Sequence, residues 1–234
     1  MKILIRLIAL SALVVASQAT AAFESIHVKA TFQPQMPITM LLRGITEGRV
    51  ILAVDVSAEG KLTDHLVVGY THKALVKPIV EALQEWRYLP ARRDGVAVPV
   101  QIELTVTLMA TGVVVSQSGS DLMESFVDRM FADQLKYHPI RSREIDRVPA
   151  RLNNSAPKYA EAALKQGVRG KVQVHFYIDE NGVARMPAVD AADHPYLAEI
   201  AVEAVRGWKF EPAMAKGEPV LVEASQEFSF GNGG

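Results

Sequence analysis

The clearest pattern of hydrophobic and polar positions lies in the C-terminal half of the chain. From Lys171 to Asp179, apolar side chains alternate with polar ones, which is the spacing of a half-buried β-strand. Glu-Asn-Gly follows at residues 180–182 and is typical of a tight hairpin turn, because Asn and Gly tolerate positive φ angles. Residues 183–191 then predict a returning strand, whose Pro187 favours an edge position or a bulge.

Helical spacing appears on both sides of this hairpin. Apolar side chains in residues 194–208 recur at helical spacing and make one apolar face. Residues 156–167 contain good helix formers and close on a Gly suited to a helix end. A last strand is predicted over residues 219–230. The order helix, strand, strand, helix, strand predicts an α+β fold, a three-stranded antiparallel sheet with helices packed on one face.

The same plan occurs earlier in the chain. When the sequence is shifted by 122 positions, residues 48–108 align with residues 170–230 without a gap. A chance match would not keep one offset across so many Gly, Trp and Pro residues, so the chain contains two tandem copies of one small fold. The coinciding residues include Gly48 with Gly170, Gly60 with Gly182, Trp86 with Trp208 and Pro90 with Pro212.

The repeat predicts two domains, at residues 23–110 and 147–234, joined by a linker at residues 111–146. An alternating stretch at residues 25–32 adds a further strand candidate to the first copy. Both tryptophans end an amphipathic helix, and we expect them in the cores rather than on a ligand surface.

The linker contains two recognisable features. Ser-Gln-Ser-Gly-Ser at residues 116–120 predicts a flexible break. The segment 121–137 then carries an apolar stripe at helical spacing, with Ser120 or Asp121 as the cap, and predicts an amphipathic helix. Two interpretations stay open: the helix packs against the domains, or it docks another protein.

The N-terminus has the features of an export signal. Lys2 and Arg6 supply a basic region, and the apolar run at residues 7–16 is shorter than the roughly 20 residues that span a bilayer. Small residues precede Phe23, so residues 1–22 are expected to be a signal peptide that is cleaved after export. The alternative is an uncleaved anchor in the inner membrane.

Composition narrows the function classes. Hydrophobic residues make up 49% of the chain and charged residues 22%, which suits a packed core. The net charge of -1 gives no electrostatic reason to expect a nucleic-acid partner. The absence of Cys excludes disulfides and a Cys nucleophile. Because the histidines lack metal spacing and no catalytic motif occurs, we expect no enzyme activity, metal or cofactor.

An ordered set of motif residues resembles the C-terminal domain of TonB, the energy transducer of Gram-negative bacteria. In the first copy, Gln-Pro-Gln-Met-Pro at residues 33–37 is similar to the Gln-Pro-Gln-Tyr-Pro of the family, with Met36 in place of Tyr. In the second copy the matching residues are Pro157, Tyr159, Gly167, Gly170, Trp208, Phe210, Pro212, Ala213, Gly217, Pro219 and Val220.

The resemblance implies a non-enzymatic periplasmic domain that binds an extended protein segment by strand addition. In the family this segment is the TonB box, at the N-terminus of outer-membrane receptors, and the last strand receives it. Carried over to the first copy, the binding residues are Gln33, Gln35 and Met36, with Val100, Ile102 and Leu104 on the strand 98–107. In the second copy they are Lys158 and Tyr159, with Val222, Ala224 and Phe228 on the strand 220–230.

The chain also departs from the family pattern. Its N-terminal apolar segment lacks the functional His of the transducers, and no long Pro- and Lys-rich spacer follows. Three hypotheses follow: a periplasmic binding module, a membrane-anchored transducer, or an enzyme with an unfamiliar site. The first copy is expected to be the better peptide binder, because the second lacks both glutamines and has Ala160 for the second Pro of the motif.

N-terminal sequencing of the exported protein separates the first two hypotheses. Because small residues end a short apolar run, the mature chain is expected to begin near Ala22 or Phe23. A membrane-integrated product that retains Met1 would favour the transducer instead.

Overall fold

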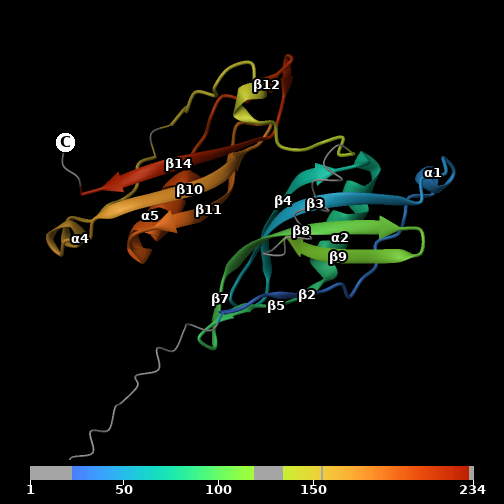
Figure 1. Ribbon diagram of the computed structural model, residues 1–234, viewed down its shortest axis with the longest axis horizontal. Coiled ribbons are helices and arrows are strands. Elements are labelled where there is room, and N and C mark those ends of the chain that lie inside the picture. Colours follow the sequence, from blue (N-terminus) through green and yellow to red (C-terminus); the bar gives the residue numbers. More distant parts are fainter. Residues whose placement is uncertain (1–22, 119–133, 154, 232–234) are drawn as a thin grey trace, which may run out of the picture.

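The computed structural model describes residues 23–118, 134–153 and 155–231 (Figure 1). The predicted signal peptide at residues 1–22 lies outside the described residues, as does the apolar stripe of the linker helix. The described chain contains two separate main sheets, each with its own hydrophobic core, and has the predicted α+β class. We call residues 23–118 the first half and residues 134–231 the second half.

Four antiparallel strands form the main sheet of the first half, in the order β4-β3-β8-β9. Their bounds are Leu62–Tyr70 for β4, Glu47–Val56 for β3, Val100–Met109 for β8 and Gly112–Ser118 for β9.

The strand β9 corrects the prediction of a three-stranded sheet. The sequence places these residues in the linker beyond residue 110 and a flexible break at Ser116, but the chain turns at Ala110 and pairs back on β8. Val113 and Val115 of β9 pack against the core of this half. Burial of these two β-branched side chains is the physical reason that the chain continues as a strand.

A helix covers one face of this sheet (Figure 1). It consists of a 3-10 turn η1 (Lys73–Leu75) and the helix α2 (Val76–Glu85), where the apolar spacing predicts a helix. Ile79 and Leu83 of α2 are fully buried in one cluster with Leu52 of β3. Trp86 follows the helix, is 5% exposed and donates its indole N–H to the Phe32 carbonyl at 2.7 Å. The core position expected for Trp86 is therefore confirmed.

Short elements complete the first half. The alternating N-terminal stretch forms only β2 (His27–Lys29), which pairs with β5 (Arg87–Leu89). A short helix α1 (Ile38–Leu41) follows the Gln-Pro-Gln-Met-Pro motif. A small additional sheet consists of β1 (Phe23–Glu24), β6 (Ala91–Arg93) and β7 (Val96–Val98).

The second half has a main sheet of three antiparallel strands in the order β11-β10-β14. Their bounds are Ala184–Ala192 for β11, Gly170–Ile178 for β10 and Val222–Phe230 for β14. The pairing of β10 with β11 shifts register opposite Met186 and Pro187, so the predicted bulge is present. Met186 adopts a φ of 51° there and is 1% exposed.

The helix α5 (Pro195–Arg206) packs on this sheet, and His194 caps it by accepting from the Tyr196 N–H. Trp208 follows the helix, is 3% exposed and donates to the Ser155 carbonyl at 2.7 Å, as Trp86 does to Phe32. The helix predicted at residues 156–167 is shorter, because only α4 (Glu161–Lys165) is helical. The remaining elements are η2 (Ser142–Glu144), β12 (Met214–Ala215) and β13 (Glu218–Pro219).

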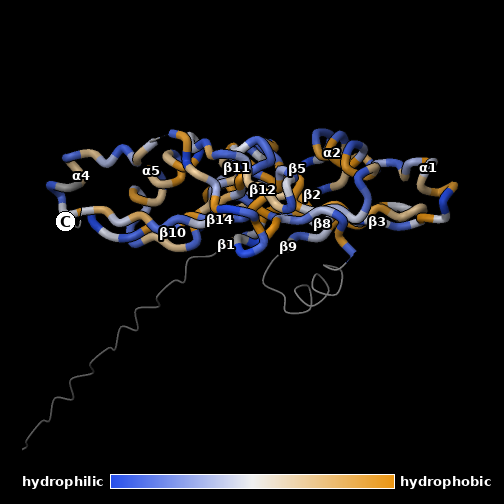
Figure 2. The backbone as a smooth tube through the Cα atoms, turned by 90° about the horizontal axis from the view of Figure 1, so that it is seen from above, coloured by the Kyte–Doolittle hydropathy of each residue, from blue (hydrophilic) through white to orange (hydrophobic). Residues whose placement is uncertain are grey.

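The repeat is visible in the fold. Residues 48–108 and residues 170–230 both run strand, strand, helix, strand, and Figure 2 shows α2 and α5 on the same side of the molecule. Gly60 and Gly182 occupy equivalent hairpin turns at φ values of 74° and 78°. A Cβ at Gly60 would lie 2.3 Å from the Tyr88 carbonyl oxygen, and one at Gly182 would lie 2.1 Å from that of Phe210.

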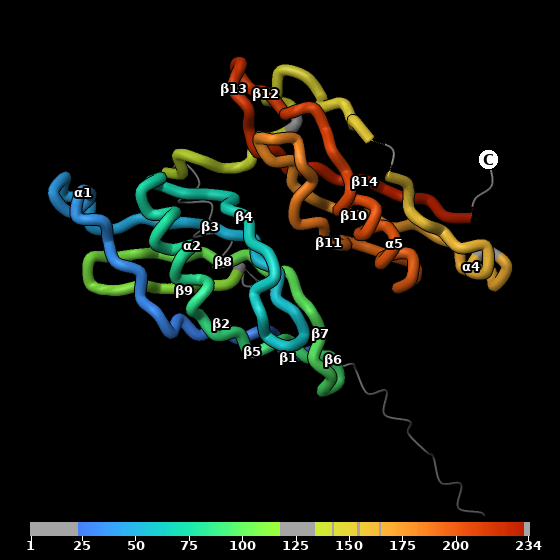
Figure 3. The backbone as a smooth tube through the Cα atoms, turned by 180° about the vertical axis from the view of Figure 1, so that it is seen from behind, coloured from blue at the N-terminus to red at the C-terminus, as the bar shows by residue number. Residues whose placement is uncertain are grey.

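The two halves contact each other through a small apolar cluster. Ala53 and Val68 of the first half are buried in it with Met186 and Leu221 of the second. Figure 3 shows the chain after residue 134 running from the first half to the β12–β13 hairpin. On this segment, Tyr137 stacks on Tyr70 with ring centroids 4.9 Å apart.

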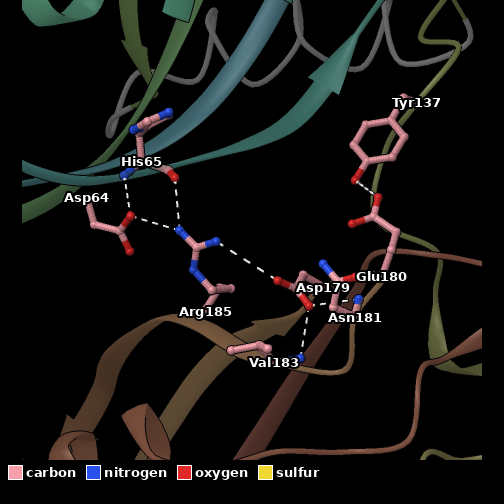
Figure 4. Close-up of polar contacts among 8 residues, drawn as sticks. All are labelled: Asp64, His65, Tyr137, Asp179, Glu180, Asn181, Val183 and Arg185. Atoms are coloured by element: carbon pink, nitrogen blue, oxygen red, sulfur yellow. Dashed lines mark hydrogen bonds and ion pairs between the residues drawn. The ribbon is translucent and has the colours of Figure 1, made fainter.

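Polar contacts also lie where the two halves meet (Figure 4). Arg185 donates from Nη2 to the Asp64 carboxylate at 2.8 Å and to the His65 carbonyl at 3.1 Å. The Tyr137 hydroxyl donates to the Glu180 carboxylate. The Arg185 contacts orient the halves relative to each other, although a partly exposed ion pair such as Arg185–Asp64 adds at most about 1 kcal/mol. The Tyr137–Glu180 hydrogen bond lies within the second half and positions the ring that stacks on Tyr70.

Replacing Gly182 by Ala should cost more stability than replacing Gly217. Both glycines have a φ near 78°, but a Cβ at Gly217 meets nothing within 4 Å. Gly217→Ala therefore costs about 1–2 kcal/mol for the backbone conformation alone. Gly182→Ala adds the overlap with the Phe210 carbonyl, about 1–3 kcal/mol more. Urea unfolding measures both, and equal losses would contradict the close approach.

Trp208→Ala should destabilise mainly the second half. Truncating such a buried aromatic costs about 3–5 kcal/mol, and the variant leaves Trp86 as the single tryptophan of the chain. Because the contact between the halves is small, the urea midpoint of the Trp86 fluorescence transition should stay at its wild-type value. The far-ultraviolet circular dichroism, which reports both halves, should show part of its transition at lower urea concentrations. A matching downward shift of both signals would mean that the halves unfold as one unit.

Candidate functional site

The strand β14 has an open edge. It pairs with β10 along its whole length, and on its other side the described residues supply only one bridge, a parallel contact of Ile140 with Val222. The Ile140 N–H donates to the Leu221 carbonyl at 2.8 Å. From residue 223 to residue 230, every second residue therefore directs its N–H and C=O away from the sheet, where another strand could pair with them. One of these groups, the Glu227 carbonyl, accepts from the Gln226 side-chain amide at 2.6 Å.

The side chains of β14 alternate as the sequence predicts. Glu223, Ser225 and Glu227 are exposed on one face, whereas Phe228 and Phe230 pack on the core. The Phe228 ring lies 5.6 Å from the Trp208 ring, centroid to centroid. An aromatic layer thus holds the backbone of the edge strand in place from its core-facing side.

A cleft of about 1130 Å³ lies beside the first part of β14. One wall is the segment 139–151, which the sequence assigns mostly to the linker, and the other is the sheet. Val148 in this wall is 81% exposed, and the Arg151 guanidinium lies 4.6 Å from the centroid of the Trp208 ring. The cleft combines apolar surface with basic side chains, which sequence reasoning missed because the family motif does not include this segment.

Polar contacts fix the segment 139–151 in place. The Asp146 carboxylate accepts from the backbone N–H groups of Lys216 and Gly217, each at 3.0 Å. The Gly217 and Lys216 N–H groups hold the pKa of Asp146 below its usual value, because they stabilise the charged form. Arg147 also pairs with Glu211 at 2.6 Å. The outer wall of the cleft is therefore held against the β12–β13 turn.

The corresponding edge in the first half is not open. There β8 pairs with β3 on one side and, from Glu103 to Met109, with β9 on the other. The prediction that this last strand offers its edge to a peptide is wrong over that range, and Leu104 lies opposite Gln117 with no exposed surface. Val100 and Ile102 lie beyond the described end of β9 and pack against the core.

The motif residues of the first half have mixed positions. Gln33 and Gln35 are exposed, and the Gln35 side-chain amide is 3.5 Å from the Gln33 carbonyl oxygen. Met36 packs against the core of the first half. The two amides are thus accessible, but the strand next to which the motif is expected to act is already paired with β9.

The motif residues of the second half lie closer together. Val222, Ala224 and Phe228 share the core-facing side of the open strand β14. The Tyr159 ring lies 5.4 Å from the ring of Phe230, centroid to centroid, and its hydroxyl donates to the Val168 carbonyl. Lys158 is exposed. Of these candidates, Ala224 and Phe228 lie on the stretch of β14 that no described strand pairs with, whereas Val222 is bridged by Ile140.

Two further properties of the described residues bear on function. None of the helices in the ranges given above is long and apolar enough to cross a membrane. Within the same ranges, no group of three His, Asp or Glu side chains could hold a metal ion.

The fold and the site define an α+β protein that presents an open sheet edge beside a cleft. The family model described as "Gram-negative bacterial TonB protein C-terminal" matches residues 33–107 and 155–231, one segment in each half. These segments cover more than half of the chain, so the protein belongs to the TonB C-terminal family.

A curated relative supports this assignment. The chain is 35% identical over 69 residues to "Protein TonB" of Yersinia enterocolitica. The match covers 29% of this chain and 27% of that protein, so the chain spans about a quarter of the relative. No solved structure gives a significant match.

Proposed function

We propose that the protein is a periplasmic binding module that adds an extended segment of a partner protein, as a new strand, to the edge of β14. The observation that carries the proposal is the unpaired edge from residue 223 to residue 230, in a chain of the TonB C-terminal family. By analogy with the family, the partner is the N-terminal segment of an outer-membrane transport receptor. No cofactor is required for such binding.

Two tandem domains with different roles follow from this proposal. The first, residues 23–118, extends beyond the expected boundary at residue 110 and fills its own acceptor edge with β9. The second, within residues 134–231, carries the open edge and the cleft. This reverses the expectation that the first copy is the better binder, because an available edge decides strand addition more than the two exposed glutamines do.

A membrane-anchored transducer is the second candidate. The apolar stretch near the N-terminus favours it, since Ile3 to Ile5 lengthen the run at residues 7–16. Both candidates use the same edge, so the state of the N-terminus distinguishes them and peptide binding does not.

Peptide titration tests the proposed edge. Strand addition draws most of its affinity from main-chain hydrogen bonds, so a peptide that resembles the TonB box, here called a box-like peptide, should bind the full chain. The same peptide with a central proline should bind at least about tenfold more weakly, because proline lacks the N–H and disturbs the ladder. Fluorescence anisotropy of labelled peptides measures both affinities.

Hydrogen exchange then identifies the strand. The bound peptide should slow amide exchange in β14, while exchange in β9, which is the outer strand of the first sheet, should not change. Equal affinity of the two peptides, or protection of β9 instead of β14, would refute the proposed site.

A further inference from the structure

The first half contains a strand, β9, that pairs with the repeat counterpart of β14. β9 lies antiparallel on β8, from Glu103 paired with Ser118 to Met109 paired with Gly112. The repeat offset of 122 residues maps β8 onto β14. The strand β9 therefore occupies, in the first half, the position that is open in the second.

The two acceptor strands are held in the same register. β8 pairs with β3 from Gly48–Leu108 to Val56–Val100, and β14 pairs with β10 from Gly170–Phe230 to Ile178–Val222. Each of these residues differs from its counterpart by 122. In an antiparallel pair the register decides which N–H and C=O groups point outward. The edge of β14 thus offers the same sequence of backbone groups that β8 offers to β9.

No described strand pairs with the corresponding part of β14, although the Gln226 side-chain amide donates to the Glu227 carbonyl at 2.6 Å and would have to yield that carbonyl to an added strand. Adding 122 to the residues that β9 covers places the expected footprint on Ser225 to Gly231. The Ile140 bridge touches only Leu221 and Val222 and lies outside this range. A strand that lies on β14 as β9 lies on β8 therefore meets the edge without displacing the segment that forms the cleft wall.

The side chains of β9 define a pattern. Val113 and Val115 face the core, whereas Val114 between them is 52% exposed. The inward residues Val113 and Val115 stand opposite Leu108 and Val106. The counterparts of these two acceptor residues on β14 are Phe230 and Phe228, so the same inward positions of a ligand would lie on an aromatic layer.

Gln117 adds a polar element to the pattern. Its side-chain amide donates to the Ile26 carbonyl at 3.0 Å, just beyond the edge of the sheet. Val28 pairs with Tyr88 in the first half, and Arg151 bridges to Phe210, the repeat counterpart of Tyr88, in the second. Ile26 lies two residues before Val28, and Pro149 lies two residues before Arg151. The carbonyl that matches that of Ile26 therefore belongs to Pro149. Pro149 lines the cleft beside β14. A ligand amide at this position would enter the cleft.

We propose that the edge of β14 accepts a partner segment that runs antiparallel to β14 and has the pattern of Gly112–Ser118. Its second and fourth residues are small and β-branched and face the aromatic layer, and its sixth is Gln or Asn. The proposal rests on the proposed function, since it specifies the sequence and direction of the strand that the same edge receives.

Disulfide trapping tests direction and register, because the chain has no Cys of its own. Thr105 pairs with Ser116, and Thr107 with Val114, which places the fifth ligand residue opposite Glu227 and the third opposite Ser229. The probe is a soluble Gly-Val-Val-Val-Ser-Gln-Ser peptide with Cys at its third or fifth position. Each form is mixed with the full-chain variants Glu227→Cys and Ser229→Cys in a glutathione buffer.

Opposed residues of neighbouring strands have Cβ atoms about 4.5–5.5 Å apart, close enough to trap a disulfide. The fifth-position peptide should therefore link to Glu227→Cys, and the third-position peptide to Ser229→Cys, each at least about fivefold more than the exchanged combinations. A peptide without Cys and with Leu for Gln at the sixth position should compete less well than the parent peptide.

The alternative outcomes are distinguishable. Preferred linking of the exchanged combinations would mean a parallel strand, which overturns this proposal and leaves the proposed function standing. No linking and no protection of β14 by either this peptide or a box-like peptide would overturn both. Glu227→Cys chains that link to each other without peptide would show that a second copy covers the edge, which also refutes the proposal.

Discussion

A β-sheet ends in a row of backbone N–H and C=O groups that need partners, and this constraint shapes both halves of the protein. In each main sheet the inner strands have a neighbour on both sides, so the backbone groups that still need partners lie on the outer strands. The first half satisfies one side of β8 with β9. In the second, no strand of the described residues pairs with the outer side of β14 from residue 223 onward. The same fold thus appears once with its acceptor edge filled and once with that edge free.

The difference between the halves arises from a few residues next to similar frameworks. Both hairpins turn at a glycine that no larger residue could replace without overlap, and both tryptophans donate to a carbonyl at 2.7 Å. The frameworks therefore place β8 and β14 alike. After β8, Val113 and Val115 supply apolar surface that gains stability by packing on the core. Beside β14, the segment 139–151 instead forms one wall of a cleft.

Much of this fold could be predicted from periodicity and from the repeat. Alternation at residues 171–179 and the Glu-Asn-Gly turn correspond to the β10–β11 hairpin, and Pro187 lies at its bulge. Such local signals are strong because side-chain spacing follows backbone geometry directly. The strand β9 was missed because Ser-Gln-Ser-Gly-Ser has the composition of a loop. Its pairing with β8 depends on the core that Val113 and Val115 complete, which no local pattern reveals.

The candidate site was predicted in part. The strand that holds Val222, Ala224 and Phe228 was correctly assigned as the last strand of the fold, but which copy has a free edge depends on β9 and not on the motif residues. The contact between the halves was not foreseen. Ala53 and Met186 look like ordinary strand residues in sequence, and only the tertiary arrangement brings them together.

The pairing of β14 with β10 has a mechanical consequence. The two strands are in register from one end to the other, and a strand added to the open edge would lie alongside both. A force that pulled such a strand along its own axis would load all of its hydrogen bonds at once in shear. A pair of strands that is loaded in shear resists pulling far better than a pair that is peeled apart from one end, where the hydrogen bonds break one after another.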